Sequence, residues 1–313
     1  MKLSELLTRI RYCLIILLIL VNNTGHSQVA EQISDSAFNT TIIDPAYKSK
    51  HPKVGLDDEH LNAFGDNFRM KGFIKLMKND GYHVTPDTTG FFNSDNLSKY
   101  EILIIGGALG SGNRDSIKQA FSPTEIDAIY NWVFQGGSLL LLTDHPPFDT
   151  SATLLVHRLG ARQGIGIVRD SINYQKENGS NKGWIIFSDE NNGLGKHAIL
   201  SGRNKSEQIR KVLTQGGSSV SGPFNSVNLL TFSKYAENQK HRSGFGPSLL
   251  QPAQMIAFEL EKGRVVISSD ATFFSAQKVT MKDGAKFNLG MSRSDFDNRQ
   301  LVLNIMHWLS RLL

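Results

Sequence analysis

The sequence predicts an α/β fold with a mostly parallel sheet and helices on both faces. Three short apolar runs, at 54–57, 139–144 and 265–270, each end in an acidic residue. Runs of this length are typical of buried parallel strands, and the helical patterns between them indicate crossover connections. Because right-handed crossovers bring the carboxyl ends of parallel strands to one edge, we expect a site at that edge.

The first half of this domain alternates between strand and helix. A strand ends near Asp57, and apolar residues spaced over 64–77 predict a helix that stops at Gly81. Two further strands are expected at 83–85 and 101–105.

A capping signal marks the next helix. In Ser122-Pro123-Thr124-Glu125, the serine suits the N-cap, the proline suits the first turn, and Glu125 has the capping-box position. The helix is expected to close at Gly136-Gly137, before a strand at 139–142 and a short helix at 152–159.

The middle of the chain, about 162–252, is less regular and predicts a β-rich insertion or an antiparallel extension of the sheet. Met255 to Leu260 and Arg264 to Ser268 are joined by three turn residues and predict a hairpin. One apolar stripe over 297–312 predicts a final helix. We therefore expect a single α/β domain over 51–313.

The N-terminus has the layout of a secretory signal peptide. Arg9 and Arg11 precede an unbroken apolar stretch, 12–21, that is shorter than the roughly 20 residues of a membrane-spanning helix. We expect cleavage after residue 27, a flexible polar leader over 28–50, and export to the periplasm or the exterior. An uncleaved anchor is the alternative; after cleavage no membrane span is expected.

Composition excludes several classes of protein. The chain has 313 residues, 40% of them hydrophobic and 20% charged, as in ordinary globular proteins. Its formal charge of +5 forms no basic stripe, so nucleic acid is not an expected partner. Cys13 lies in the predicted signal peptide, so a mature chain would lack disulfides and a cysteine nucleophile.

The first candidate cluster follows the strand that ends at Asp57. Asp58, Glu59 and His60, with Asn62, could bind a polar ligand, and His60 could hold a divalent cation. The structural alternative is a solvated loop that caps a helix. The expected closeness to the next cluster favours a functional role.

The second cluster is Thr143-Asp144-His145-Pro146-Pro147, where two prolines force the chain to turn. We take Asp144 and His145 as candidate catalytic residues, because a carboxylate beside an imidazole can orient it for proton transfer. Both are also candidate ligands of a divalent metal. An aspartate that caps the next helix is an equally good interpretation.

Two other strand ends complete the predicted site. Gly106 and Gly107 could let a polar ligand approach the backbone, and Asp270 could add a third carboxylate. The structural alternative for the glycines is a flexible loop. For Asp270 it is a capping role. The sequence contains no P-loop. It also contains no Gly-x-Ser-x-Gly elbow, which disfavours an ordinary serine hydrolase.

The sequence resembles the class I glutamine amidotransferase-like superfamily, whose fold is flavodoxin-like, and more closely uncharacterised bacterial domains and ThuA-like proteins. The resemblance is carried by the segments 100–107, 125–132, 136–145, 263–266 and 304–309. It implies a catalytic cysteine at the turn where this chain has Thr143-Asp144-His145, so amidotransferase thiol chemistry is not expected. ThuA-like proteins can place a histidine near this turn, which makes His145 the equivalent. Their link to carbohydrate metabolism suggests a ligand class by association.

Three functional hypotheses follow, and whether the protein is an enzyme stays open among them. The first is an exported domain that binds a small polar molecule, with carbohydrate as the leading class, at the strand ends. The second is a metal-assisted hydrolase that uses the same Asp and His residues. The third is a non-catalytic interaction domain of an envelope assembly.

Overall fold

The computed structural model describes residues 29–91, 94–109, 118–176, 182–239 and 252–313. The predicted signal peptide lies outside these residues. The described residues form two units, one of 29–32 and 279–287 and the other of those that fall within 33–278 and 288–313. In the smaller unit, the turn between β15 (Ala276–Met281) and β16 (Lys286–Gly290) is closed by a bond from Met281 N to Ala285 O, at 2.8 Å.

A nine-stranded sheet forms the centre of the larger unit. Its parallel part has the order β3-β2-β4-β5-β14, and the antiparallel strands β13, β10 and β6 continue it, with β11 also paired to β13. The strand bounds are β2 (Lys53–Asp57), β3 (His83–Asp87), β4 (Ile102–Gly106), β5 (Ser138–Leu142), β6 (Arg162–Gly164), β10 (Ser219–Ser221), β11 (Val227–Thr231), β13 (Ala253–Leu260) and β14 (Gly263–Ser268). The predicted α/β fold is thus confirmed.

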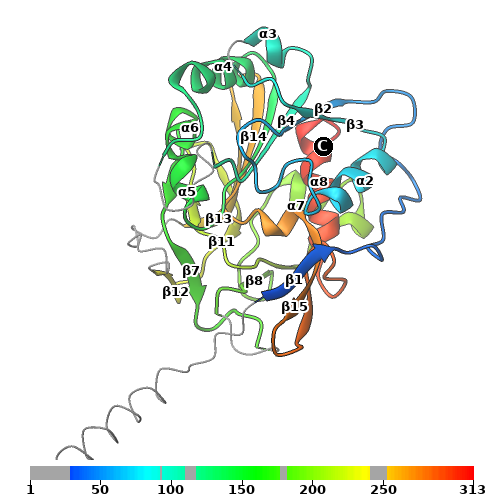
Figure 1. Ribbon diagram of the computed structural model, residues 1–313, viewed down its shortest axis with the longest axis vertical. Coiled ribbons are helices and arrows are strands. Elements are labelled where there is room, and N and C mark those ends of the chain that lie inside the picture. Colours follow the sequence, from blue (N-terminus) through cyan, green and yellow to red (C-terminus); the bar gives the residue numbers. More distant parts are fainter. Residues whose placement is uncertain (1–28, 92–93, 110–117, 177–181, 240–251) are drawn as a thin grey trace, which may run out of the picture. The chain divides into compact units, whose positions relative to one another are not determined.

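Helices cover both faces of the parallel strands (Figure 1). The apolar residues of α2 (Lys71–Asn79) and α8 (Asn298–Leu309) form one core with β2, and those of α4 (Pro123–Phe134) and α6 (Thr153–Arg158) form another with β5. Every residue of β4 and β5 is buried. Since both faces are covered, these strands are apolar throughout, which is why their sequences read as continuous hydrophobic runs.

The start of α4 follows the predicted capping box. Ser122 Oγ accepts a bond from Glu125 N at 3.3 Å, and the Glu125 carboxylate accepts one from Ser122 N at 3.0 Å. Two backbone donors that the helix cannot satisfy are therefore bonded by these side chains.

The helix predicted from residue 64 begins only at Lys71, so that part of the prediction is wrong. Phe64 N donates to Gly106 O and Ala63 N donates to Gly107 O, both at 3.0 Å. Asp58 Oδ1 also accepts a bond from Asp66 N. These bonds hold the segment in turns against β4, and long-range bonds of this kind override the helical spacing of the phenylalanines.

The segment expected to be a flexible leader has ordered contacts. It includes β1 (Val29–Ser34), and Asp35 N donates to Ala276 O at 3.0 Å. Farther along, Ala46 N donates to Asp80 Oδ1 at 2.8 Å, and Tyr47 N donates to Asp80 O at 3.1 Å. Its polar composition hid these bonds, because they use backbone groups rather than an apolar face.

The middle region contains both predicted alternatives. Its strands β6, β10 and β11 extend the main sheet, while β7 (Ile167–Asp170) pairs with β12 (Ala236–Gln239), and β8 (Ile186–Ser188) pairs with β9 (Lys211–Leu213). The predicted hairpin is formed by β13 and β14, and the final helix by α8. Within the described residues, no helix is both long enough and apolar enough to span a membrane.

The fold predicts that Gly106 tolerates no larger residue. A Cβ atom built there would lie 2.3 Å from Phe64 O, a backbone atom that is fixed by its neighbours. We expect Gly106→Ala to lower the free energy of unfolding by about 3 kcal/mol, the upper part of the range for overpacked sites. Chemical denaturation would measure this change.

Gly216→Ala is the control for this substitution. Gly216 has a positive φ of 103°, but no atom lies within 4 Å of its Cβ position, so alanine there adds backbone strain alone. We expect a loss of about 1 kcal/mol from that strain. Equal losses in the two variants would contradict the steric role of Gly106.

Candidate functional site

The carboxyl ends of the parallel strands lie at one level. Gly106 pairs with Leu142 in the β4–β5 ladder, and Leu142 pairs with Ser268 in the β5–β14 ladder. Backbone bonds of 2.8 Å continue this alignment past the strands, from Gly107 N to Leu142 O and from Thr143 N to Ser268 O. The strand-end edge that the sequence predicts is therefore present, and its residues form two clusters.

The first cluster is centred on His60, which is buried. Its Nδ1 lies 2.9 Å from Asp57 Oδ1 and its Nε2 lies 2.9 Å from Glu125 Oε1. The ring also lies against two phenylalanines, with centroid distances of 5.2 Å to Phe91 and 4.6 Å to Phe121. The imidazole thus joins the end of β2 to the start of α4 between two carboxylates.

Electrostatics stabilise the charged form of this cluster. Burial lowers the pKa of His60, whereas the carboxylates of Asp57 and Glu125 raise it. Together the two carboxylates outweigh burial, so the pKa lies above its usual value. Burial likewise opposes ionisation of Glu125, but its bonds with Ser122 and His60 hold its pKa below the usual value. Both shifts therefore favour the charged forms, an imidazolium at His60 beside a carboxylate at Glu125.

Other residues predicted for this cluster have different surroundings. Asn62 Nδ2 donates to Asp57 Oδ2 at 2.9 Å, and so supports the His60 cluster. Asp58 instead holds the backbone of Asp66, and Glu59 is exposed. Both ring nitrogens of His60 are bonded to carboxylates in this structure, and its role as a metal ligand stays a prediction.

The second cluster follows β5 and β14. Asp144 is buried, and its Oδ1 accepts a bond from His145 N at 2.7 Å while its Oδ2 accepts one from Ala271 N at 3.2 Å. Burial raises the pKa of Asp144 despite these bonds. The side chain thus connects the two loops that leave neighbouring strands, which brings the predicted residues Asp144 and Asp270 into one cluster.

His145 is the accessible member of this cluster. Its side chain is 36% exposed, and its Nε2 lies 3.7 Å from Asp144 Oδ1. Its Nδ1 donates to Pro146 O at 2.9 Å, which fixes the orientation of the ring. The ring also contacts Phe148, at a centroid distance of 6.2 Å. His145 is thus presented to solvent above a buried carboxylate.

Two more buried aspartates lie near this turn. Burial and the charge of Asp144 raise the pKa of Asp270 to about 7, although its carboxylate accepts bonds from the backbone of Gln215 and Phe273. Burial also raises the pKa of Asp149 to about 7, against bonds from Thr150 N and Gly166 N and against the charge of His145. Both carboxyls can change protonation near neutral pH.

A buried polar layer supports this cluster from beneath. Gln163 Nε2 donates to Ser218 Oγ at 2.8 Å, and Ser218 Oγ donates to Asp144 O at 2.8 Å. Thr143 Oγ1 donates to Gln163 Oε1 at 3.2 Å. The β-rich middle region, which supplies Gln163 and Ser218, therefore helps to fix the loop that carries Asp144 and His145.

The glycines after β4 serve close packing. Phe64 crosses directly over Gly106, and Gly107 has a positive φ of 58°. In this structure the glycines therefore allow the backbone of residues 63–64 to approach the end of β4. The rest of the Gly-rich segment, 110–112, lies outside the described residues.

Sequence reasoning did not assign a site role to Asp149, Gln163 or Glu125. Asp149 reads as an ordinary helix-start residue, and Gln163 lies in a region without clear periodicity. Glu125 was recognisable as a cap, but its bond to His60 spans 65 positions and has no local signal. Only the three-dimensional arrangement identifies these partners.

Metal-binding geometry is not found in the described part of the chain, where no group of three or more His, Cys, Asp or Glu residues could hold an ion. Asp144 and His145 remain candidate ligands only as a pair. Two hollows lie at the opposite ends of the strands. One of about 420 Å³ lies beside the starts of β2 and β3, and one of about 330 Å³ lies beside the starts of β4 and β5.

The raised pKa of Asp149 predicts that part of the stability is lost as the pH rises. Its folded-state pKa of about 7 exceeds the unfolded value, so its contribution is complete below about pH 4 and is lost as the pH rises through 7. We expect the free energy of unfolding to fall less steeply between pH 5 and pH 8 in Asp149→Asn than in the unmodified protein. Urea denaturation at several pH values would measure it.

Asp127→Asn is the matched control, since Asp127 is an exposed acid on α4. It should leave the slope of stability against pH as it is in the unmodified protein. A slope that Asp149→Asn does not alter would contradict the raised pKa of Asp149.

The His60 cluster predicts a second pH dependence. The raised pKa of His60 gives stability that is present below the ordinary imidazole value of 6.5 and lost as the pH rises through the folded-state pKa. The lowered pKa of Glu125 gives stability that is present above the ordinary value of 4.5 and lost as the pH falls through its folded-state pKa. The cluster should therefore be strongest between these ordinary values.

Glu125→Gln tests this cluster. It removes one carboxylate from His60, and we expect a loss of about 1–3 kcal/mol at pH 6 together with a lower His60 pKa by NMR titration. Glu101→Gln, which removes an exposed pair with Lys50, should cost less than about 1 kcal/mol. An unchanged His60 pKa in Glu125→Gln would contradict the assignment.

Comparison with known proteins gives a fold and no family. No protein-family model and no curated protein matches the chain. Among solved structures, the mmIFT52 N-terminal domain is similar at 14% identity, with a TM-score of 0.59 over 82% of this chain and 96% of that one. At this identity the match shows a shared fold.

Similar structures with lower scores include ThuA-like proteins. One from Bacteroides uniformis is 14% identical, with a TM-score of 0.42 over 85% of this chain and 94% of that one. Another, from Parabacteroides merdae, is 12% identical, with a TM-score of 0.38 over 83% and 90% of the two chains. The fold assignment rests on the mmIFT52 domain, and these structures add no residue role to it.

Proposed function

We propose that the strand-end edge binds a small polar molecule, with carbohydrate as the leading class, and that His145 contacts it. One observation carries this proposal: His145 is 36% exposed at the turn after β5, while Asp144, Asp149 and Asp270 beside it are buried. The ring is thus the part of this cluster that a ligand in solvent can reach.

The fixed geometry of the turn supports binding. The Asp144 side chain bonds to backbone amides of two loops, and Pro146 O orients the imidazole. A site that is already ordered loses less conformational entropy when it binds a ligand. The surrounding polar layer therefore favours a preformed site.

The protonation of the buried acids supports a ligand with hydroxyl groups. Asp149 and Asp270 each have a pKa of about 7, so they are partly protonated and partly ionised at neutral pH. A hydroxyl can both donate and accept a hydrogen bond, so a ligand with hydroxyl groups suits these surroundings whichever of the two carboxyls is protonated. This property distinguishes a sugar from a simple anion or cation.

The same pKa values favour acid–base chemistry as the second candidate function. A group with a pKa near the working pH is suited to proton transfer, and His145 could relay a proton to a bound molecule. The metal-assisted form of this hypothesis would rest on Asp144 and His145, with the divalent ion still to be identified. A non-catalytic interaction domain is the third possibility and predicts no ligand at His145.

Export belongs to this proposal as an expectation from residues 1–27. The resemblance to the class I glutamine amidotransferase-like superfamily also belongs here. Export would place the protein in the periplasm or the exterior, and the resemblance would place it among flavodoxin-like α/β domains.

The experiment is a ligand screen by NMR. Mono- and oligosaccharides would be added to the isotopically labelled protein, and we expect chemical-shift changes at the amides of residues 143–149 and at the His145 ring. His145→Gln should weaken the binding by at least about tenfold, which is roughly 1.4 kcal/mol. The variant keeps a polar side chain of similar size.

His157→Gln is the matched control, because His157 is an exposed histidine of α6 that belongs to neither candidate site. Its binding should equal that of the unmodified protein. Shift changes that avoid residues 143–149, or equal losses in both variants, would overturn the assignment of His145. Turnover of a bound sugar that stops in His145→Gln would favour the hydrolase.

A further inference from the structure

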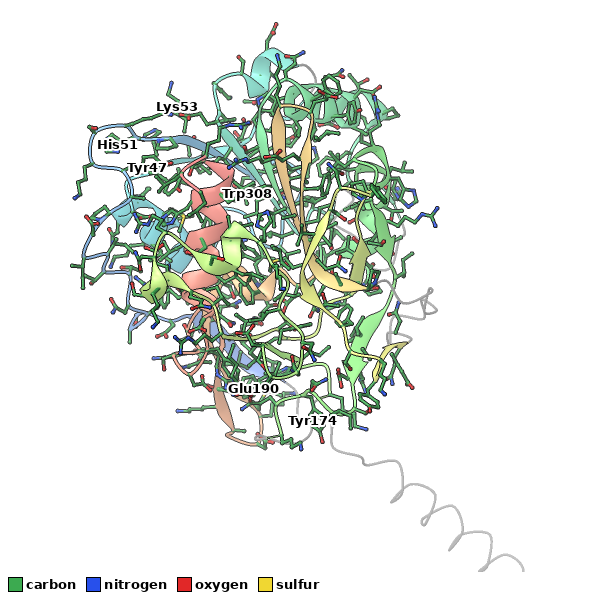
Figure 2. The ribbon with its side chains drawn as sticks, turned by 180° about the vertical axis from the view of Figure 1, so that it is seen from behind. Tyr47, His51, Lys53, Tyr174, Glu190 and Trp308 are labelled. Carbon is green, nitrogen blue, oxygen red and sulfur yellow. The ribbon has the colours of Figure 1, made fainter. Side chains whose placement is uncertain are left out.

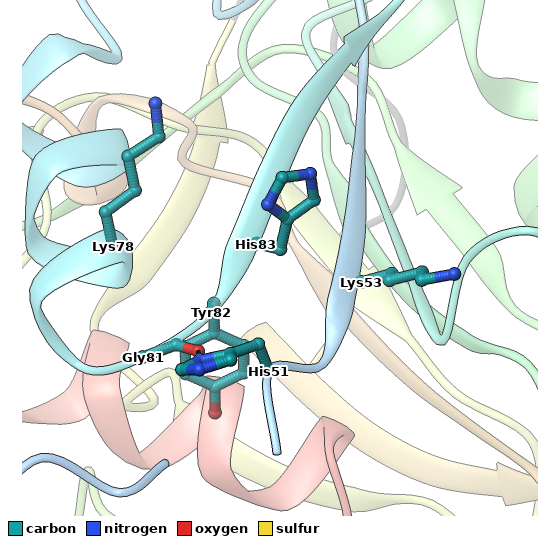
Figure 3. A pocket seen from close by; sticks show the side chains of 6 residues that line it. All are labelled: His51, Lys53, Lys78, Gly81, Tyr82 and His83. Atoms are coloured by element: carbon teal, nitrogen blue, oxygen red, sulfur yellow. Dashed lines mark hydrogen bonds between the residues drawn. The ribbon is translucent and has the colours of Figure 1, made fainter. Parts of the chain in front are cut away.

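A second candidate site lies at the opposite edge of the sheet, beside the starts of β2 and β3. This hollow has a volume of about 420 Å³ and is lined by His51, Lys53, Lys78, Gly81, Tyr82 and His83 (Figure 3). Four of these six residues are basic. The strands are five residues long, so the hollow lies about 13 Å along them from the strand-end edge.

The basic side chains come from three separate elements. Lys53 and His83 are partners in the parallel β2–β3 ladder, so both side chains leave the same face of the sheet. Lys78 belongs to the last turn of α2. β3 is the outermost strand of the sheet, so no further strand of this sheet covers the side of β3 that faces away from β2.

The floor of the hollow is rigid. Tyr82 is buried, and its hydroxyl is 2.9 Å from Ser310 Oγ. His51 Nδ1 donates to Gly81 O at 2.7 Å, so this ring is fixed and its Nε2 faces away from that bond. Gly81 has a positive φ of 96°, and a Cβ there would overlap Tyr47 O, which explains the glycine at this position.

The segment before β2 supplies this geometry. Tyr47 OH donates to Ser310 O at 3.3 Å, and the Tyr47 and Tyr82 rings meet edge to face at 5.1 Å. Figure 2 shows Tyr47, His51 and Lys53 along one side of the molecule, on the chain that enters β2. The hollow is therefore built from ordered elements.

A buried acid beside the hollow is bonded within the protein. Asp80, next to Gly81, is buried; its Oδ1 accepts a bond from Ala46 N and its Oδ2 lies 2.7 Å from His307 Nε2. The carboxylate thus has its own partners within the protein. Lys53 and Lys78 have exposed side chains at the hollow, where they can meet an anion.

We propose that this hollow binds a small phosphorylated molecule, independently of the site at His145. Lysine binds phosphate as a point charge, and histidine can add a directed hydrogen bond. The volume matches that of small-ligand pockets, which begin at about 300 Å³. The exposed His51 ring offers an apolar surface for the organic part of the ligand.

The ligand must draw the two lysines together. Figure 3 shows His83 between Lys53 and Lys78, whose ammonium groups extend in different directions. Ordering two lysine side chains costs conformational entropy, so inorganic phosphate alone should bind weakly, with a Kd on the order of 1 mM. An ester that also contacts the rings should bind more tightly.

The test is an NMR titration of the full chain with inorganic phosphate, glucose 6-phosphate and glucose. We expect the two phosphates to shift the amides of Lys53, Gly81, Tyr82 and His83, and glucose to leave them in place. The Lys53→Gln Lys78→Gln variant should bind both phosphates at least about tenfold more weakly. Tighter binding of the ester would identify a phosphorylated metabolite rather than free phosphate as the ligand.

The control is Lys71→Gln Lys75→Gln, which removes the same charge from exposed positions of α2 outside the lining. It should bind phosphate within about twofold of the unmodified protein. Equal weakening in both double variants would show general attraction to a basic surface and overturn the site. The absence of shifts at about 20 mM phosphate would also overturn it. Thermal melting checks that each variant is folded.

Discussion

The parallel register of β4, β5 and β14 is the constraint on which the candidate functional site depends. Gly106, Leu142 and Ser268 end their strands at one level, so the loops that follow begin side by side. Asp144 can then bond to the loop after β14, which a shift of one residue would prevent. Helices on both faces hold this register by burying the strands completely.

Local patterns were sufficient to predict much of the fold. The leucines of β5, the Ser122 capping box and the β13–β14 hairpin each carry their signal within a few residues. The start of α2 and the ordered segment before β2 were not predictable, because their backbone bonds go to Gly106 and Asp80, far along the chain.

The candidate site was predictable as a place more than as a set of contacts. The acids after β2, β5 and β14 were predicted to lie at one edge of the sheet, and the structure brings Asp144, His145 and Asp270 into one cluster there. The bond between His60 and Glu125 could not be inferred from the sequence, because it depends on how close the end of β2 lies to the start of α4. The pKa values of Asp149 and Asp270 likewise depend on burial that only the assembled core provides.

Glu125 has one consequence for how the molecule opens. Its carboxylate both caps α4 and holds His60, so the first turn of that helix and the chain after β2 share an anchor. A local fluctuation that frays the helix must also release the histidine, and the reverse holds. These two segments should therefore behave as one cooperative unit in amide hydrogen exchange, although they are distant in sequence.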